Sequence, residues 1–332
     1  MKRKQSGLRI MSRLIVLVKP LSGFMCLAVL LGVLGFLCAI QITVTGSLTL
    51  LTAAKISGGI AIKTGCICII IFAVLRGFLH YGEQACNHYI AFKLLALIRD
   101  KVFKAMRRLS PAKLEGKDKG NLVSVITSDI ELLEVFYAHT ISPTCIAILT
   151  CLIMLIFIGR YSIWLSFVAL AAYITVGAVI PLVSSRVNKN VGMTYRDGSG
   201  ALSGFVLDSM RGLLESIRYN STDKRLEEMD KKTDELNSLQ NKLKKIEGHT
   251  GAVTDIAIIF FSVAMLLTGI ALYQKGVIGF DGMIVSTVSM MSSFGPVAAL
   301  SGLAGNLTHT LAAGERVLGI LDETLSLIHI SE

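Results

Sequence analysis

Six long apolar segments restrict what this chain can fold into. They occupy residues 21–45, 56–80, 141–159, 163–183, 252–273 and 283–305. A helix needs roughly 20 residues to cross a hydrocarbon core of about 30 Å, and only helices and closed barrels satisfy their own backbone hydrogen bonds there. Each segment reaches that length. The sequence therefore predicts an all-α membrane protein with six transmembrane helices.

The composition agrees with a membrane protein and argues against a nucleic-acid partner. Of the 332 residues, 53% are hydrophobic and only 17% are charged, which is too apolar for an ordinary soluble domain. The net charge of +10 comes from basic residues placed between apolar runs. A nucleic-acid-binding domain would instead gather them on one polar surface. The seven cysteines are scattered, without the spacing of a disulfide framework or a metal site.

The connections between the segments predict the orientation in the membrane. Short connections join segments one and two, three and four, and five and six, and they hold few basic residues. Two long connections of about sixty residues or more, and the residues before segment one, hold most of the Lys and Arg. Because basic residues mark cytoplasmic loops, both long connections and both termini are expected in the cytoplasm.

The two long connections are predicted to be helical rather than irregular. Each long connection contains a stripe of apolar residues at helical spacing. The first stripe is Leu95, Ile98, Val102, Met106 and Leu109, and the second is Leu236, Leu239, Leu243 and Ile246. No proline interrupts either stretch, so each can continue a membrane helix. A second helix from Ile56 to about Leu109 would be some 80 Å long and would project far from the bilayer.

Each pair of extended helices is expected to end in a crosswise tip. Ser110, Pro111 and Gly116 mark the first tip, and Gly120 opens the next helix. The second tip lies near 212–220. Such a tip could seat in the groove of a partner; the alternative is a solvated turn.

Three local strings, together with the spacing of the spans, resemble the transmembrane domain of ABC exporters. They are GNLVSVITSDIE at 120–131, DSMRGLLESI at 208–217 and AAGERVLGILD at 312–322. The resemblance implies a first coupling-helix region with Ser110, Pro111, Leu114, Gly116, Gly120 and Asp129. It implies a second with Arg211, Gly212, Leu213, Glu215 and Ile217, and a linker motif with Glu315 and Arg316.

The same resemblance implies a domain organisation and partners. Residues 1–20 would form a cytoplasmic segment and 21–322 the transmembrane domain, with a linker start and artefactual tail at 323–332. A nucleotide-binding domain, fused or separate, would bind ATP and Mg, and this chain itself would hold no cofactor. A second half-transporter would complete a homodimer or heterodimer in the bacterial cytoplasmic membrane. The sequence is most similar in character to the CydC and CydD thiol exporters; lipid, peptide or drug export are the alternatives.

The sequence as given lacks the motifs of the ATPase. A P-loop follows the pattern G-x-x-x-x-G-K-[ST]. The one Gly-Lys pair, Gly116-Lys117, has Pro111 in place of the first glycine and Asp118 in place of Ser or Thr. We therefore expect no enzymatic activity from this chain alone, and a reading frame shortened near residue 324 or a separate ATPase chain. A rival hypothesis from another class is a membrane sensor with cytoplasmic signalling helices.

Polar residues inside apolar segments are the candidates for contact with cargo, because an ionisable group in a span usually faces a cavity or a partner. The polar candidates are Gln41, Arg76, His80 and Asp255. Met290 is a further candidate, because it lies in the sixth segment, made adaptable and mildly polar by neighbouring serines; the alternative is that this segment only packs against other helices. Arg76, His80 and Glu83 share one helix face by their spacing. That face is either a patch for a zwitterionic cargo or a self-satisfied charged cluster at the membrane edge. No metal-ligand spacing is present.

Overall fold

The computed structural model describes residues 7–56, 60–110, 125–301 and 304–323, and these are helical almost throughout. Six helices in this part of the chain are long and apolar enough to cross a membrane. They are Lys19–Ala53, Ile62–Leu109, Ser142–Gly159, Ile163–Val187, Thr222–Gln274 and Phe280–Leu300. The predicted fold class is therefore confirmed. The second helix begins at Ile62 rather than at Ile56, after Ala61 in a non-helical conformation. Lys55, just after the first helix, is left-handed (φ 57°), which is typical of a residue that follows a helix end.

The element order follows the six spans. A short α1 (Gly7–Leu17) and a 3-10 turn η1 (Lys19–Leu21) precede α2 (Ser22–Ala53) and α3 (Ile62–Leu109). The third long helix comprises η2 (Val125–Asp129), α5 (Ile130–Phe136), η3 (Tyr137–Ile141) and α6 (Ser142–Gly159). The fourth comprises α7 (Ile163–Ile174), η4 (Thr175–Val179) and α8 (Ile180–Arg211). Then come α9 (Leu213–Arg218), α10 (Thr222–Gln274), α11 (Phe280–Ser301) and α12 (Ala304–Leu321).

Two π-helical turns interrupt the third and fourth helices just ahead of prolines. The turn η3 precedes Pro143, and η4 precedes Pro181. A proline inside a helix has no N–H to donate and its ring crowds the carbonyl one turn earlier. Widening that turn into a π-helix relieves the crowding without ending the helix. Both long helices therefore continue through their prolines.

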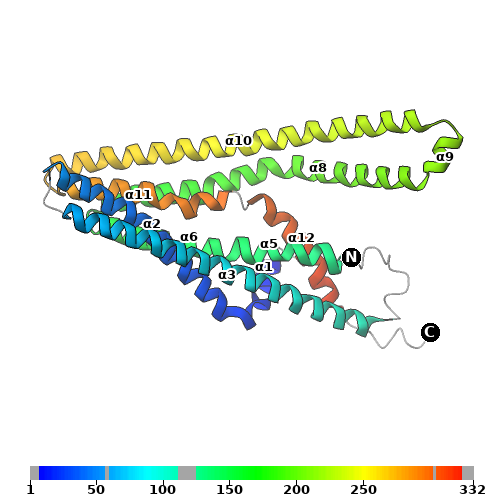
Figure 1. Ribbon diagram of the computed structural model, residues 1–332, viewed down its shortest axis with the longest axis horizontal. Coiled ribbons are helices and arrows are strands. Elements are labelled where there is room, and N and C mark those ends of the chain that lie inside the picture. The colour runs from blue at the N-terminus through cyan, green and yellow to red at the C-terminus, as the bar shows by residue number, and fades with distance from the viewer. Residues whose placement is uncertain (1–6, 57–59, 111–124, 302–303, 324–332) are drawn as a thin grey trace.

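The short loops and the long helix extensions lie at opposite ends of the molecule (Figure 1). The helix α10 has 53 residues, which corresponds to roughly 80 Å. It runs beside α8, and α9 lies crosswise between their far ends (Figure 1). The predicted stripe from Leu236 to Ile246 is half-buried in this pair; a Cβ on Gly198 would lie 3.4 Å from Leu236 Cδ1. The predicted extension of the spans is thus present.

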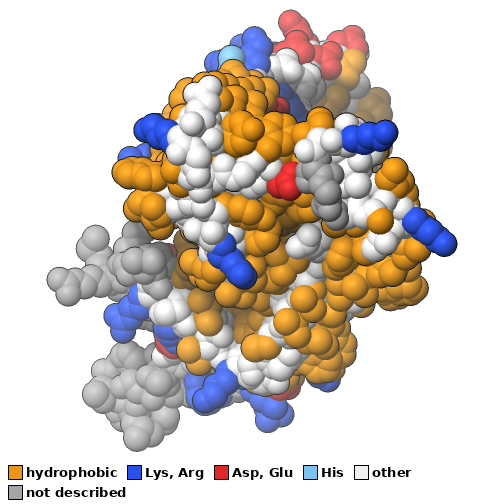
Figure 2. Space-filling view, turned by 90° about the vertical axis from the view of Figure 1, so that its left-hand side faces the viewer, with side chains coloured by type: hydrophobic (Ala, Val, Ile, Leu, Met, Phe, Trp, Pro, Cys, Tyr) orange, Lys and Arg blue, Asp and Glu red, His pale blue; other side chains and the backbone are white. Residues whose placement is uncertain are grey.

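Two hydrophobic clusters hold the helices together. One joins α2, α6, α7, α10 and α11 around residues such as Ile158, Leu165 and Met265, which are fully buried. The other joins α1, α3, α5 and α12 around Leu14, Ile90 and Leu133. Seen from the short-loop end, much of the outer surface is also hydrophobic (Figure 2). Apolar side chains on the outside of long helices suit contact with lipid.

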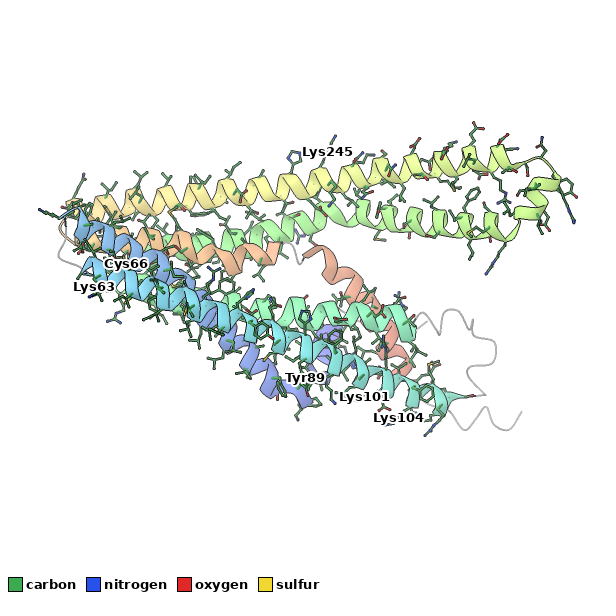
Figure 3. The ribbon with its side chains drawn as sticks, viewed as in Figure 1. Lys63, Cys66, Tyr89, Lys101, Lys104 and Lys245 are labelled. Atoms are coloured by element: carbon green, nitrogen blue, oxygen red, sulfur yellow. The ribbon has the colours of Figure 1, made fainter. Side chains whose placement is uncertain are left out.

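Basic side chains mark the extended part of the helices. Lys101 and Lys104 lie on the distal part of α3, beyond Tyr89, whereas Lys63 and Cys66 lie near the short-loop end (Figure 3). Lys245 lies on α10 where it leaves the apolar region. All seven cysteines are free.

Candidate functional site

The second predicted tip is the short helix α9, which presents apolar side chains to solvent. α8 ends at Arg211, and the N–H of the following Gly212 donates to the Asp208 carbonyl at 2.9 Å. Of the following residues, Leu214 is 70% exposed, Ile217 59% and Tyr219 81%. Exposed apolar side chains on a projecting helix are typical of a surface that binds a partner. Of the predicted residues, Arg211, Leu213 and Glu215 are also exposed, and Gly212 is half-buried.

Contacts behind α9 hold the end of the hairpin in place. Arg225 of α10 donates from Nη1 to Ser209 Oγ at 3.0 Å and lies over the ring of Phe205, 5.6 Å from its centroid. Lys232 contacts the same ring at 5.4 Å. Such cation–π contacts contribute about 0.5–1 kcal/mol each at exposed sites. Asn220, with φ 50°, makes the turn from α9 into α10. The tip is therefore fixed relative to both long helices.

The first predicted tip lies mostly outside the described residues. α3 ends at Leu109. The following Ser110 is extended, and its N–H donates to the Met106 carbonyl at 3.0 Å. Pro111, Leu114, Gly116 and Gly120 belong to the part of the chain that is not described.

The structure joins one residue of the first coupling region to one of the linker motif. Arg316 Nε donates to Asp129 Oδ2 at 2.6 Å, and Arg316 Nη2 donates to Asp129 Oδ1. The Asp129 side chain is 4% exposed and the Arg316 side chain 52%. The hydrogen bonds to Asp129 raise the pKa of the Arg316 guanidinium. Planar, two-point pairing of this kind fixes orientation as well as charge. Glu315 lies beside it and is half-buried.

The helix α1 lies within the predicted N-terminal segment 1–20 and packs against the same region. Tyr137 Oη donates to the Leu14 carbonyl at 2.8 Å, and burial raises the pKa of this phenol. Arg13 pairs with both carboxylate oxygens of Asp322 at 2.5 Å. A Cβ on Gly314 would lie 2.9 Å from Leu14 Cδ1, so α1 and α12 approach closely. No local pattern reveals these contacts, because they join residues far apart in the sequence.

The five candidate cargo residues lie in different environments. Arg76 and His80 are exposed on α3, and Asp255 is exposed on α10. Gln41 on α2 is half-buried, whereas Met290 on α11 is fully buried and packs in the core. The burial of Met290 agrees with a role of α11 in packing, because membrane helices with small and hydroxyl-bearing residues use them to pack against other helices. His80 Nδ1 lies 3.2 Å from Glu83 Oε2, so these two residues of the predicted cluster do meet.

Comparison with known proteins identifies the family. The family model of the ABC transporter transmembrane region matches residues 21–297. A probable ABC transporter ATP-binding/permease protein of Haemophilus influenzae is 42% identical over 320 residues, covering 96% of this chain. The glutathione/L-cysteine transport system ATP-binding/permease protein CydC of the same organism is 22% identical over 257 residues, covering 76% of this chain.

A third relative differs in its named substrate. The ATP-dependent lipid A-core flippase of Shewanella frigidimarina is 28% identical over 123 residues, covering 37% of this chain and 20% of the flippase. The chain spans 58% of the length of the first Haemophilus relative and 44% of that of CydC. The family match covers most of the chain and agrees with its six apolar helices. The chain belongs to the ABC transporter transmembrane-region family.

Proposed function

We propose that this chain forms half of the translocation pathway of an ATP-driven exporter and transmits motion from an ATPase through its cytoplasmic tips. The observation that carries the proposal is α9, a crosswise helix with exposed Leu214 and Ile217, followed by exposed Tyr219, at the end of two helices that continue into the membrane. A stiff helix of this length transfers a displacement at its tip to its membrane part. The coupling residues are therefore Arg211, Gly212, Leu213, Glu215 and Ile217, with the undescribed first tip in the equivalent role.

The partners follow from this role. A nucleotide-binding domain, fused or separate, would bind the tips and supply ATP and Mg. A second half-transporter would close the pathway as a homodimer or heterodimer. ATP then acts as a population shift, because it stabilises the state with closed tips more than the state with open tips. The basic residues of the long extensions support tips and termini in the cytoplasm. The bacterial origin of the relatives supports a place in the bacterial cytoplasmic membrane.

The cargo of first choice is a small thiol such as glutathione or cysteine, because CydC, which matches three quarters of the chain, carries those names. A lipid is the second candidate, since the lipid A-core flippase matches a shorter part. The two candidates can be distinguished by measuring uptake into inside-out vesicles, with radiolabelled cysteine, glutathione and a lipid analogue as substrates. ATP-dependent uptake of either thiol supports the first choice, and transfer of the lipid alone contradicts it.

A pair of matched variants tests the coupling role of α9. We expect Leu214→Ser to reduce transport at least tenfold in the full-length protein with its ATPase, while ATP hydrolysis continues. The control is Leu226→Ser, at an apolar residue of α10 that is 52% exposed but lies outside α9. It should leave both activities near wild type. Wild-type transport by Leu214→Ser would contradict the proposal, as would an equal loss in both variants.

A further inference from the structure

Three helices meet around a buried carboxyl group near one end of the apolar region. Glu83 of α3 is 7% exposed. A Cβ built on Gly32 of α2 would lie 3.2 Å from Glu83 Cδ and 2.3 Å from Ile146 Cδ1 of α6. Gly32 therefore lets α3 and α6 approach α2 closely, and the Glu83 carboxyl is enclosed at that point. Its hydrogen-bond partner in the described chain is His80, whose side chain is 64% exposed.

The register of α3 against the third long helix places two further polar residues beside Glu83. The two helices run antiparallel: Glu83 is level with Ile146, and nearer the tips Arg99 Nη2 lies 3.3 Å from Glu131 Oε1. One turn from Glu83 towards the tip is Asn87, and one turn from Ile146 in the same direction is Ser142. Residues four apart share a helix face. The register therefore places Asn87 and Ser142 at the same level of the two helices, one turn below the carboxyl.

Both residues carry a buried oxygen without a hydrogen bond. Asn87 is 3% exposed and Ser142 is fully buried. Asn87 Oδ1 and Ser142 Oγ have no hydrogen-bond partner within the described ranges. An unsatisfied buried polar group costs about 1–3 kcal/mol. Two such atoms beside an enclosed carboxyl therefore indicate a group that the protein atoms do not supply.

The chemistry of that group follows from the atoms around it. The Glu83 carboxylate and the Asn87 carbonyl oxygen are acceptors, and the Ser142 hydroxyl can also accept. We propose that Glu83, Asn87 and Ser142 form a binding site for a primary ammonium group. Its three N–H donors match the three oxygens, and its positive charge offsets the buried carboxylate. A quaternary ammonium carries the same charge but has no N–H to donate.

The exposed edge of the site is His80, which contacts the Glu83 carboxyl and whose side chain is 64% exposed. An ammonium could arrive on a lipid headgroup or on a soluble amine, and both sources present the same donors. The site stands independently of the transport role, because it concerns binding alone.

Thermal unfolding of the chain in phosphatidylcholine nanodiscs tests the site, at constant ionic strength. We expect saturating ethanolamine to raise Tm by about 3 °C or more, and choline or sodium chloride to raise it by less than about 1 °C. The absence of a shift with ethanolamine would overturn the proposal. An equal shift with choline would indicate a charge effect only, and a shift with sodium alone would indicate an inorganic cation site; either result also overturns it.

Variants connect the shift to the three residues. Glu83→Gln, Asn87→Leu and Ser142→Ala should each reduce the ethanolamine shift at least threefold. Asn87→Leu and Ser142→Ala remove unpaired polar atoms, so their Tm without ligand should equal or exceed that of the wild type. The matched control is Ser289→Ala, because Ser289 is also fully buried with an unpartnered hydroxyl, but on α11. A full shift in the three site variants would overturn the assignment.

Nanodiscs of phosphatidylethanolamine distinguish the two sources of the amine. If the lipid headgroup fills the site, the wild-type Tm is already raised in these discs, ethanolamine adds nothing, and Asn87→Leu removes the difference between the two lipids. If the source is a soluble amine, the response to ethanolamine is the same in both lipids. Both outcomes support an ammonium site and assign its occupant.

Discussion

Arg316 and Asp129 lie 187 residues apart in the sequence and form a two-point ion pair, with Nε to Oδ2 at 2.6 Å. The pair fastens α12, which follows the sixth span, to the start of the third long helix, which follows the first tip. Any displacement of the start of the third long helix would therefore also move α12. The predicted first coupling-helix region and the predicted linker motif are thus connected by this ion pair.

Removing the cation of this pair should destabilise the protein. Arg316→Met leaves the carboxylate of Asp129 buried without a partner, and we expect a loss of about 2 kcal/mol in the free energy of unfolding. This is less than the 3–5 kcal/mol of a fully buried pair, because the Arg316 side chain is 52% exposed. Thermal unfolding in detergent measures it. Adding Asp129→Asn should restore most of the loss.

A matched control is the Arg13–Asp322 pair, which has the same geometry but side chains 35% and 42% exposed. Arg13→Met should cost less than about 1 kcal/mol. Equal losses for Arg13→Met and Arg316→Met would contradict the importance of the buried Asp129 carboxylate.

The contact between α1 and α12 depends on the glycine at 314. Gly314→Phe should displace α1, because the added side chain would overlap Leu14. Gly319→Phe on the same helix is the control, since a Cβ there meets nothing within 4 Å. Hydrogen exchange of the α1 amides should accelerate at least tenfold in the first variant and stay near wild type in the second. Similar exchange in both variants would argue against close packing.

Near their short-loop ends, α2 and α3 approach so closely at Gly65 that a side chain there should destabilise the protein. A Cβ there would lie 2.0 Å from Thr49 Oγ1, whose hydroxyl already donates to the Thr45 carbonyl at 2.7 Å. Gly65→Ala should therefore lower the free energy of unfolding by about 1–2 kcal/mol. Gly77→Ala, on the same helix with open space around it, should be neutral or stabilising because alanine favours helix. The reverse order of Tm values would refute this contact.

The buried phenol of Tyr137 predicts a loss of stability at high pH. Burial raises its pKa in the folded protein above the value of about 10 for an unfolded chain. Above pH 10 the unfolded state therefore releases a proton that the folded state retains, so stability is complete below pH 10 and falls as the pH rises. Tyr137→Phe should show a shallower fall between pH 10 and 11 in thermal unfolding. Identical slopes would contradict this cause.

Apolar length and periodicity are local properties, and they predicted the six spans and their extensions. The second tip was also predictable, because Gly212 and the change of pattern after it are visible in sequence. The place of α1 was not, since its contacts join Tyr137 to Leu14 and Arg13 to Asp322 across the chain. The placement of Asn87 and Ser142 at the same level depends on the register of α3 against the third long helix, which neither segment shows by itself. The cargo candidates stay predictions, because their grouping requires the complete assembly.

Labelling from the two sides of the membrane tests the central claim, that the long helices carry α9 into the cytoplasm. In a chain without its seven cysteines, Tyr219→Cys and Val277→Cys place one thiol directly after α9 and one in a short loop, at residues 81% and 58% exposed. A membrane-impermeant maleimide should label the first only in inside-out vesicles and the second only in spheroplasts. Labelling of Tyr219→Cys in intact spheroplasts would contradict the account.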